Sequence, residues 1–211
     1  MSIGIGENLT ESFGYAKDKI AGDIGTWIIL AILGIIPIVN LIVVGTFLKI
    51  YRGEAPKLEN IGKSFVDGLL AIIISIIYMI IPTILAIFIG AFLVFNPVAG
   101  PLSIFEGLTP VGVVLIVVCI ALFILFSLLL TPALINFARN GFGAAFSFGK
   151  IFGMVSKAGW LKYILSVIIL GIIMSIICLL ELIPFIGFII MIILLPFLTC
   201  WSSRFCANIF E

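Results

Sequence analysis

The chain has 211 residues, of which 64% are hydrophobic and only 10% are charged, and its mean hydropathy is +1.44. Soluble domains are about one quarter charged and about half apolar. A chain this apolar cannot cover its surface with polar groups in water, which excludes a soluble domain. We therefore predict an all-α integral protein of the cell membrane with roughly four to six spans, because each span needs about 20 residues.

Residues that commonly bind metals and redox cofactors are scarce. The sequence has no histidine, and its four cysteines lie in apolar runs without CxxC spacing: Cys119, Cys178, Cys200 and Cys206. These two facts argue against zinc, haem and iron–sulfur sites. The lack of histidine also removes the commonest general base near neutral pH. We therefore expect neither a metal, nor another cofactor, nor enzymatic activity.

The first 50 residues contain two predicted segments. Residues 7–22 place apolar side chains at spacings of three and four, which predicts an amphipathic helix lying along the membrane surface. Residues 24–50 form an apolar run with Gly34, Pro37 and Asn40 at its centre. This run is either one full span or a re-entrant helical hairpin. The two arms of a hairpin, each about 15–20 Å long, would be too short to cross roughly 30 Å of hydrocarbon.

The remaining elements follow from further apolar runs separated by proline, glycine and charged residues. We predict an interfacial helix at 55–65, spans at 66–95, 111–138, 159–182 and 186–208, an outer loop at 96–110 and a third interfacial amphipathic helix at 142–157. Together they form a single membrane domain over residues 1–211. The hairpin interpretation gives four full transmembrane helices plus the re-entrant hairpin, and the alternative gives five full spans.

The positions of lysine and arginine orient the chain, since these residues stay on the cytoplasmic side. The loop 96–110 has neither, and the turn 181–187 carries only Glu181, so both lie outside. If the first apolar run spans fully, Lys17 and Lys19 are also outside. If it is a hairpin, all 11 basic residues are cytoplasmic. We favour the hairpin, which places the N-terminus and the C-terminus in the cytoplasm.

Two stretches of the chain resemble one another. Arg52 is followed eleven residues later by Lys63 within G-K-S-F, and Arg139 is followed eleven residues later by Lys150 within G-K-I-F. Each stretch reads as the end of an apolar segment, an arginine, a short connector and G-K-x-F. This echo favours a duplicated unit that forms a pseudo-symmetric bundle; chance similarity in a chain of low diversity is the alternative.

Polar side chains within the apolar segments are the candidate functional residues. Asn40 and Asn136 each follow a proline closely, so they either bond the backbone groups that proline frees or line a cavity open to the cytoplasm. Tyr78, near the kink at Pro82, is expected to make hydrogen bonds between helices. Glu181 is the only acidic residue embedded in an apolar run, which makes it a candidate proton or cation site.

The basic residues of the two similar stretches form a second candidate group. Arg52, Lys63, Arg139 and Lys150 lie at the ends of apolar segments, which places them at the level of the lipid headgroups. Anionic headgroups attract lysine and arginine at this level. We therefore expect these four side chains to contact anionic lipid.

Several of these motifs resemble DUF4013, an archaeal and bacterial family of multi-pass membrane proteins. The resemblance rests on P-I-V-N (37–40), K-I-Y-R-G-E (49–54), F-V-D-G-L (65–69), P-A-L-I-N-F-A (132–138) and A-A-F-S-F-G-K-I-F (144–152). After Glu54 this chain reads A-P-K-L-E-N, where the family has an acidic stretch with a tryptophan. The family has no established activity, so the resemblance implies a topology and adds no chemistry.

These features lead to two functional hypotheses. The first is a non-enzymatic membrane protein that organises lipid or a protein partner. The alternative is a small transporter or channel built from two related halves. The expected partners are membrane lipid and, as further candidates, a second copy of the chain or another membrane protein; nucleic acid is not expected.

Overall fold

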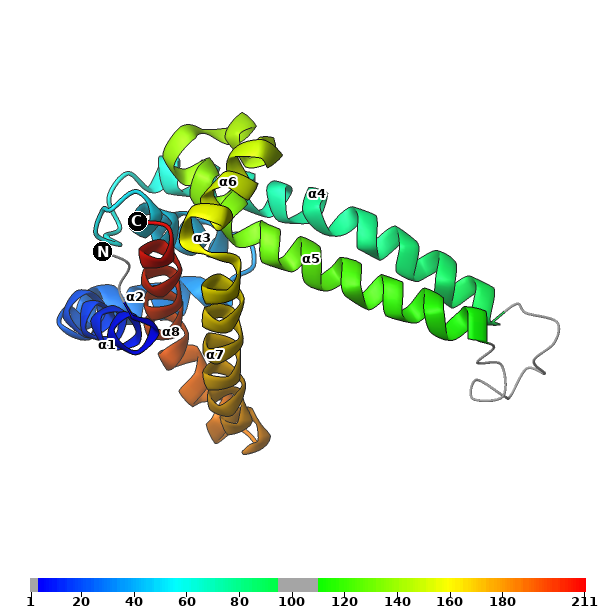
Figure 1. Ribbon diagram of the computed structural model, residues 1–211. Coiled ribbons are helices and arrows are strands. Elements are labelled where there is room, and N and C mark those ends of the chain that lie inside the picture. Colours follow the sequence, from blue (N-terminus) through cyan, green and yellow to red (C-terminus); the bar gives the residue numbers. More distant parts are fainter. Residues whose placement is uncertain (1–3, 95–109) are drawn as a thin grey trace. The chain divides into compact units, whose positions relative to one another are not determined.

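The computed structural model describes residues 4–94 and 110–211, and within these ranges the chain forms helices and no strand (Figure 1). In chain order the elements are α1 (Ile5–Ala16), η1 (Lys17–Ala21), α2 (Ile24–Ile35), α3 (Asn40–Tyr51), α4 (Ile61–Val94), α5 (Pro110–Asn140), η2 (Phe142–Phe146), α6 (Phe148–Ala158), α7 (Trp160–Cys178), η3 (Leu179–Leu182) and α8 (Ile186–Ile209). The predicted outer loop at 96–110 lies outside the described residues, except for Pro110. The all-α fold class is confirmed.

Within the described residues, four helical segments are long and apolar enough to cross a membrane. They are Ile61–Ala91, Val111–Asn140, Trp160–Leu182 and Ile186–Ile209. These segments correspond to the four predicted spans, each within a few residues. The agreement arises because an uninterrupted run of about 20 apolar residues has few stable conformations other than a helix.

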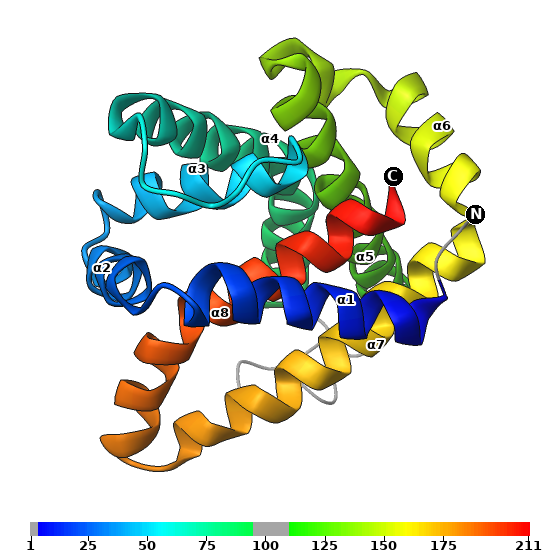
Figure 2. The same cartoon turned by 90° about the vertical axis from the view of Figure 1, so that its left-hand side faces the viewer.

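The first apolar run is divided into two short helices. α2 and α3 have 12 residues each, and residues 36–39 between them are not helical. Each helix is about 18 Å long at 1.5 Å per residue, so neither can span a membrane by itself. In Figure 2, α2 is seen nearly along its axis whereas α3 lies across the view, so the two arms do not run antiparallel. Whether this segment re-enters a membrane stays a prediction.

The interfacial helix predicted at 55–65 is not present as a separate element. Residues 54–59 are irregular, and the G-K-S-F stretch belongs to the first turns of α4. The reason lies in Lys49, whose Nζ donates to the carbonyl oxygens of Lys57 and Glu59, both at 2.7 Å. Because these carbonyls bind an ammonium group from another element, the connector follows α3 instead of coiling into a helix.

The third predicted interfacial helix, 142–157, is divided at Ser147 into a short 3-10 turn and the helix α6, and a glycine with positive φ lies just beyond each end. Gly141 has φ +89°, and a short 3-10 turn (η2) follows it before α6 begins. Gly159, with φ +88°, then ends α6 and starts α7. Glycine adopts these left-handed angles without steric cost. The two similar stretches therefore differ in structure. G-K-S-F belongs to the start of the long helix α4, whereas G-K-I-F lies in the separate short helix α6.

The chain forms two compact units. Unit 1 contains residues 1–72 and 132–211, and unit 2 contains residues 73–131. Within unit 2, α4 and α5 contact each other through the rings of Tyr78 and Phe126, whose centroids are 6.4 Å apart.

Helix α8 is the centre of unit 1. α1, α2 and α3 all pack against it, and α1 crosses the C-terminal half of α8 (Figure 2). The core between them includes Ile20, Leu30, Phe47 and Trp201. Trp27 Nε1 of α2 also donates to a backbone carbonyl of α8 at 2.6 Å. Burial of each large apolar side chain stabilises such a core by about 1.5–3 kcal/mol.

Helices α3 and α4 cross so closely within unit 1 that their backbones touch. An added Cβ at Gly45 would lie 1.7 Å from the carbonyl oxygen of Ser64. An added Cβ at Gly68 would lie 1.9 Å from the carbonyl oxygen of Leu41. Both distances are far below van der Waals contact, so any larger side chain must force the two helices apart. The absence of a side chain at Gly45 and Gly68 therefore allows the start of α4 to pack directly against α3.

The face of α1 that packs against α8 is partly polar. Its buried residues include Asn8 and Ser12. Asn8 Nδ2 donates to the carbonyl oxygen of Phe205 at 3.1 Å, and Asn208 Nδ2 donates to Asn8 Oδ1 at 2.8 Å. Asn208 Nδ2 also donates to the carboxylate of Glu11. The apolar face of α1 also packs in unit 1, since Ala16 is fully buried and Leu9 packs against the core. The helix therefore meets α8 through a mixed apolar and polar face, and its position along the membrane stays a prediction.

An arginine completes this polar contact between α1 and α8. The guanidinium of Arg204 forms an ion pair with Glu11 at 3.1 Å and lies 5.2 Å from the ring centroid of Tyr15. Burial raises the pKa of the Tyr15 hydroxyl to about 12, so this group stays a neutral hydrogen-bond donor at physiological pH. Trp201 Nε1 adds a bond to the carbonyl oxygen of Leu9 at 3.2 Å. The two helices therefore share one continuous polar network.

Candidate functional site

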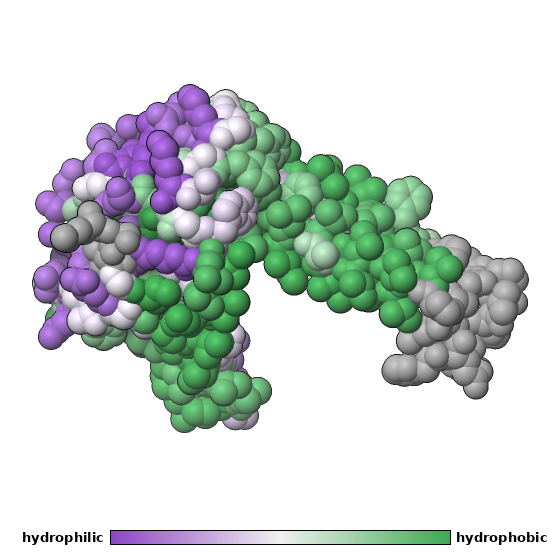
Figure 3. All heavy atoms as spheres, viewed as in Figure 1, coloured by the Kyte–Doolittle hydropathy of each residue, from purple (hydrophilic) through white to green (hydrophobic). Residues whose placement is uncertain are grey.

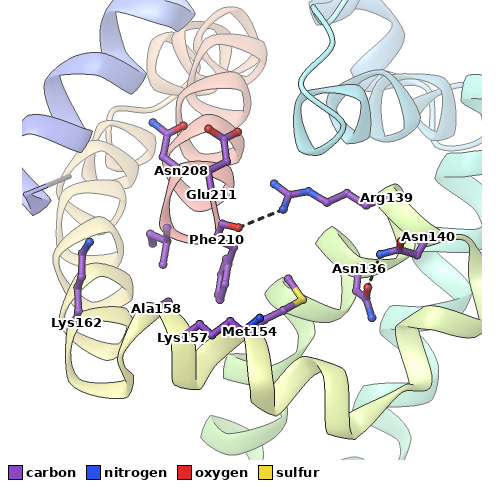
Figure 4. A pocket seen from close by; sticks show the side chains of 11 residues that line it. Asn136, Arg139, Asn140, Met154, Lys157, Ala158, Lys162, Asn208, Phe210 and Glu211 are labelled. Carbon is purple, nitrogen blue, oxygen red and sulfur yellow. Dashed lines mark hydrogen bonds between the residues drawn. The ribbon is translucent and has the colours of Figure 1, made fainter. Parts of the chain in front are cut away.

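An open cavity of about 620 Å³ lies in unit 1 where four helices meet (Figure 4). The C-terminal ends of α5, α6 and α8 and the first turn of α7 surround it. Its lining consists of Asn136, Arg139, Asn140, Met154, Lys157, Ala158, Lys162, Asn208, Ile209, Phe210 and Glu211. Amides and basic side chains make up most of the polar part of this lining.

The cavity carries an excess of positive charge. Three basic residues line it, Arg139, Lys157 and Lys162, against a single acidic residue, Glu211. Glu211 forms an ion pair with Arg204 at 3.2 Å. Across the described ranges, neither lysine of the cavity forms an ion pair. The charges of these two lysines are therefore available to a ligand.

Arg139 is held in place by carbonyl groups from two other elements. Its Nε donates to the carbonyl oxygen of Tyr51 at 2.8 Å, and its NH1 donates to that of Phe210 at 3.2 Å (Figure 4). Carbonyl groups at helix ends lack partners within their own helix and carry partial negative charge. Arg139 thus satisfies the C-terminal ends of α3 and α8 while its charge lines the cavity.

Arg52 makes the reciprocal contact. Its Nε donates to the carbonyl oxygen of Ala138 at 2.7 Å, near the C-terminal end of α5. The two arginines of the similar stretches therefore make reciprocal contacts. Arg52, which follows α3, donates to the end of α5, and Arg139, near the end of α5, donates to the end of α3. Arg52 also forms an ion pair with Asp67 at 2.7 Å, and both side chains are less than one-fifth exposed.

Two asparagines shape the floor of the cavity. Asn136 is buried, and its Nδ2 donates to the carbonyl oxygen of Ala144 at 2.7 Å. Asn140, one turn later, donates from Nδ2 to Asn136 Oδ1 at 2.7 Å (Figure 4). This chain of amides joins the end of α5 to the turn η2. It fixes the direction in which α6 leaves and therefore where Lys157 lies.

A second cavity, of about 390 Å³, lies beside the connector between α3 and α4. It is lined by Lys49, Arg52, Glu54, Ala55, Lys57, Glu59, Asn60 and Lys63. Most of its charges already have partners within the protein. The ammonium group of Lys49 binds two backbone carbonyls, and burial lowers the pKa of Lys49 below its ordinary value. Arg52 is engaged by Asp67. The first cavity is therefore the better candidate for ligand binding.

The structure brings some of the predicted polar residues to the cavity and leaves others elsewhere. Asn136 and Arg139 line the cavity. Asn40 is the first residue of α3, Tyr78 is buried in unit 2, and Glu181 is exposed in η3 at the turn between α7 and α8. None of these last three lines either of the two cavities described.

The predicted headgroup residues are also divided. Arg52 and Lys63 line the second cavity, and Lys150 is exposed on α6 outside both cavities. The sequence pointed to neither Lys157 nor Lys162 as a site residue. The sequence shows only that Lys157 and Lys162 lie where α6 ends and the span α7 begins. It does not show that the ends of α5 and α8 lie opposite these two lysines.

Comparison with known proteins adds a family but no activity. The sequence profile of the protein family of unknown function DUF4013 matches residues 29–197. An uncharacterized protein of Methanocaldococcus jannaschii is 37% identical over 128 residues, which cover 61% of this chain and 41% of that protein. The match thus covers less than half of the relative's length. No solved structure matches the chain. Since the profile covers most of the chain, the protein belongs to the DUF4013 family.

Proposed function

We propose that this protein is a non-enzymatic, multi-pass membrane protein that organises anionic lipid on the cytoplasmic side of the membrane. The observation that carries the proposal is the cavity lined by three basic residues, two of them without ion-pair partners in the described chain. It lies where α7, an apolar helix of spanning length, begins.

The surface of unit 1 supports this location. The exposed side chains along α7 are large and apolar: Leu161, Leu165, Ile168, Ile172 and Ile176. Hydrophilic residues gather instead over α1, the connector between α3 and α4, and the C-terminal end of α8 (Figure 3). An exposed apolar surface of this size is stable only against lipid or another protein. The change from apolar to basic surface near Lys162 matches the boundary between hydrocarbon and headgroups, where lysine side chains reach toward the headgroups.

Helix α6 supports the same boundary. Ile151 and Val155 face the protein interior and are fully buried, whereas Phe148 and Phe152 are more than two-fifths exposed. Exposed aromatic rings beside lysine are typical of helices that lie in the membrane interface.

The proposal predicts that the purified protein retains anionic lipid. After gentle detergent extraction from a mixed membrane, native mass spectrometry is expected to show phosphatidylglycerol-type lipid enriched over zwitterionic lipid, because basic side chains attract anionic headgroups. The lipid is expected to be recovered chemically unchanged after prolonged incubation. Equal retention of neutral and anionic lipid would contradict the lipid role, and turnover of the lipid would contradict the non-enzymatic role.

The topology gives a separate prediction. In a variant without native cysteines, Lys17→Cys is expected to remain unlabelled when a membrane-impermeant thiol reagent is added outside intact cells. The reason is that a re-entrant segment over residues 24–50 returns the chain to its starting side. A cysteine at Glu181, in the turn between α7 and α8, is the matched control and is expected to react from outside. Labelling at position 17 would show that the segment spans fully.

A further inference from the structure

We infer that the cavity between the ends of α5, α6 and α8 and the start of α7 is a binding site for one phosphate group, with Lys157 and Lys162 as its principal ligands. This inference rests on the proposed function and names the site and the chemistry through which it acts. The phosphate belongs either to the headgroup of an anionic lipid or to a soluble phosphate ester.

The charge of the cavity selects an anion. Lys157, Lys162 and Arg139 line the cavity from three different elements, α6, α7 and α5 (Figure 4). Each ammonium group offers three N–H donors, and neither is used in an ion pair within the described chain. Arg139 donates from Nε and NH1 to backbone carbonyls, so its NH2 group is available to bind a ligand. A tetrahedral phosphate has enough acceptor oxygens to bind donors arriving from several directions.

The charged acceptor of the cavity lining is already paired within the protein. Glu211, the acidic residue of the lining, forms an ion pair with Arg204. The Oδ1 of Asn136 accepts from Asn140. Asn208 directs its amide nitrogen toward Asn8 and Glu11 on α1, while its Oδ1 is buried without a hydrogen-bond partner in the described chain. The charged donors of Lys157, Lys162 and Arg139 therefore outnumber the charged acceptor of the lining, as an anion requires.

The size and position of the cavity agree with a phosphate ester. Its volume of about 620 Å³ exceeds what a bare phosphate needs and leaves room for a glycerol-sized group. Met154 and Ile209 provide apolar contact within the same lining. The lysines lie beside the first turn of an apolar helix, where the phosphate of a membrane lipid would also lie.

Binding by purified full-length protein tests the site. The protein in detergent is titrated with a short-chain phosphatidylglycerol, and bound ligand is counted by native mass spectrometry. The double variant Lys157→Gln, Lys162→Gln is expected to bind about thirtyfold more weakly, because each lysine near an anionic group contributes about 1 kcal/mol and 1.4 kcal/mol is a factor of ten. Glutamine keeps similar length but removes the charge.

Two further variants make the test specific. The double variant Lys17→Gln, Lys19→Gln removes the same net charge from exposed positions outside both cavities, and it is expected to keep nearly full affinity. Lys157→Arg with Lys162→Arg retains both charges and is expected to stay within about threefold of the natural protein. An equal loss of affinity in the two glutamine variants, or no loss in the cavity variant, would overturn the inference.

A soluble ligand distinguishes the two sources of phosphate. If the site serves a lipid, short-chain phosphatidylglycerol is expected to bind more tightly than glycerol phosphate, and the cavity variant to weaken both. If glycerol phosphate binds as tightly as the lipid and depends on the same lysines, the site holds but serves a soluble ester, so the lipid role fails separately. Binding of short-chain phosphatidylcholine at the strength of phosphatidylglycerol would overturn the selection for an anion.

Discussion

Replacing Gly45 with alanine is expected to lower the stability of the folded protein by about 3 kcal/mol, at the upper end of the cost of inserting a methyl group into a packed site. The added methyl would lie 1.7 Å from the carbonyl oxygen and 2.6 Å from the carbonyl carbon of Ser64. These are backbone atoms, so no side-chain rotation relieves the overlap. The measurement is the midpoint of thermal unfolding in detergent, followed by size-exclusion chromatography of heated samples. Gly68→Ala is expected to behave alike.

Gly62→Ala is the matched control in the same region of α4. No atom lies within 4 Å of an added Cβ at this position. Alanine has a higher helix propensity than glycine by about 1 kcal/mol. The control is therefore expected to leave the midpoint unchanged or to raise it. Similar midpoints for Gly45→Ala and Gly62→Ala would show that α3 and α4 do not touch at their backbones.

Replacing Asp67 with alanine is expected to destabilise the protein by about 3 kcal/mol, because it leaves the charge of Arg52 unpaired in a largely buried place. The side chains of Arg52 and Asp67 are only 17% and 13% exposed, and their charged atoms lie 2.7 Å apart. Arg52 also holds the end of α5 through the carbonyl oxygen of Ala138. The loss is expected to appear as a lower unfolding midpoint and as faster proteolysis of the connector between α3 and α4.

The ion pair between Lys57 and Glu59 provides the control. Its charged atoms are 4.0 Å apart, and its side chains are 69% and 70% exposed. Exposed pairs of this kind contribute about 0–1 kcal/mol. Glu59→Ala is therefore expected to leave the midpoint almost unchanged. If Asp67→Ala is equally mild, the ion pair does not hold the ends of α3 and α5 together.

The elements that could be predicted are those whose cause is local. Long apolar runs gave the four spans, and Gly34 with Pro37 indicated the break in the first run. The form of the connector after α3 and the packing of α1 depend instead on contacts between residues far apart in the sequence. The connector after Arg52 is irregular because Lys49 binds its carbonyls. The inward face of α1 includes Asn8 beside the apolar Leu9 and Ala16, because Asn208 of α8 donates to Asn8. An amphipathic pattern identifies the apolar face, but it does not show which polar residues beside that face find partners in the protein.

In the candidate site, too, some residues could be predicted from a local sequence signal and others could not. Asn136 and Arg139 were predicted because a polar residue inside an apolar run and a basic residue at its end are visible in the sequence. Lys157 and Lys162 lie on either side of Gly159, at an interfacial border that any membrane protein has in several places. Only the approach of α5 and α8 turns that border into one wall of a cavity. Sequence spacing carries no record of this approach.

The polar contact between α1 and α8 has a consequence for biosynthesis. Asn8 and the carbonyl of Phe205, which it binds, are 197 positions apart. At typical rates of translation, roughly 10–40 s separate the appearance of these two groups. During that interval Asn8 and Ser12 of α1 can bond each other but lack their partners on α8, which are Asn208 and the carbonyl oxygen of Phe205. The packing of α1 within unit 1 is therefore completed only after α8 has been synthesised.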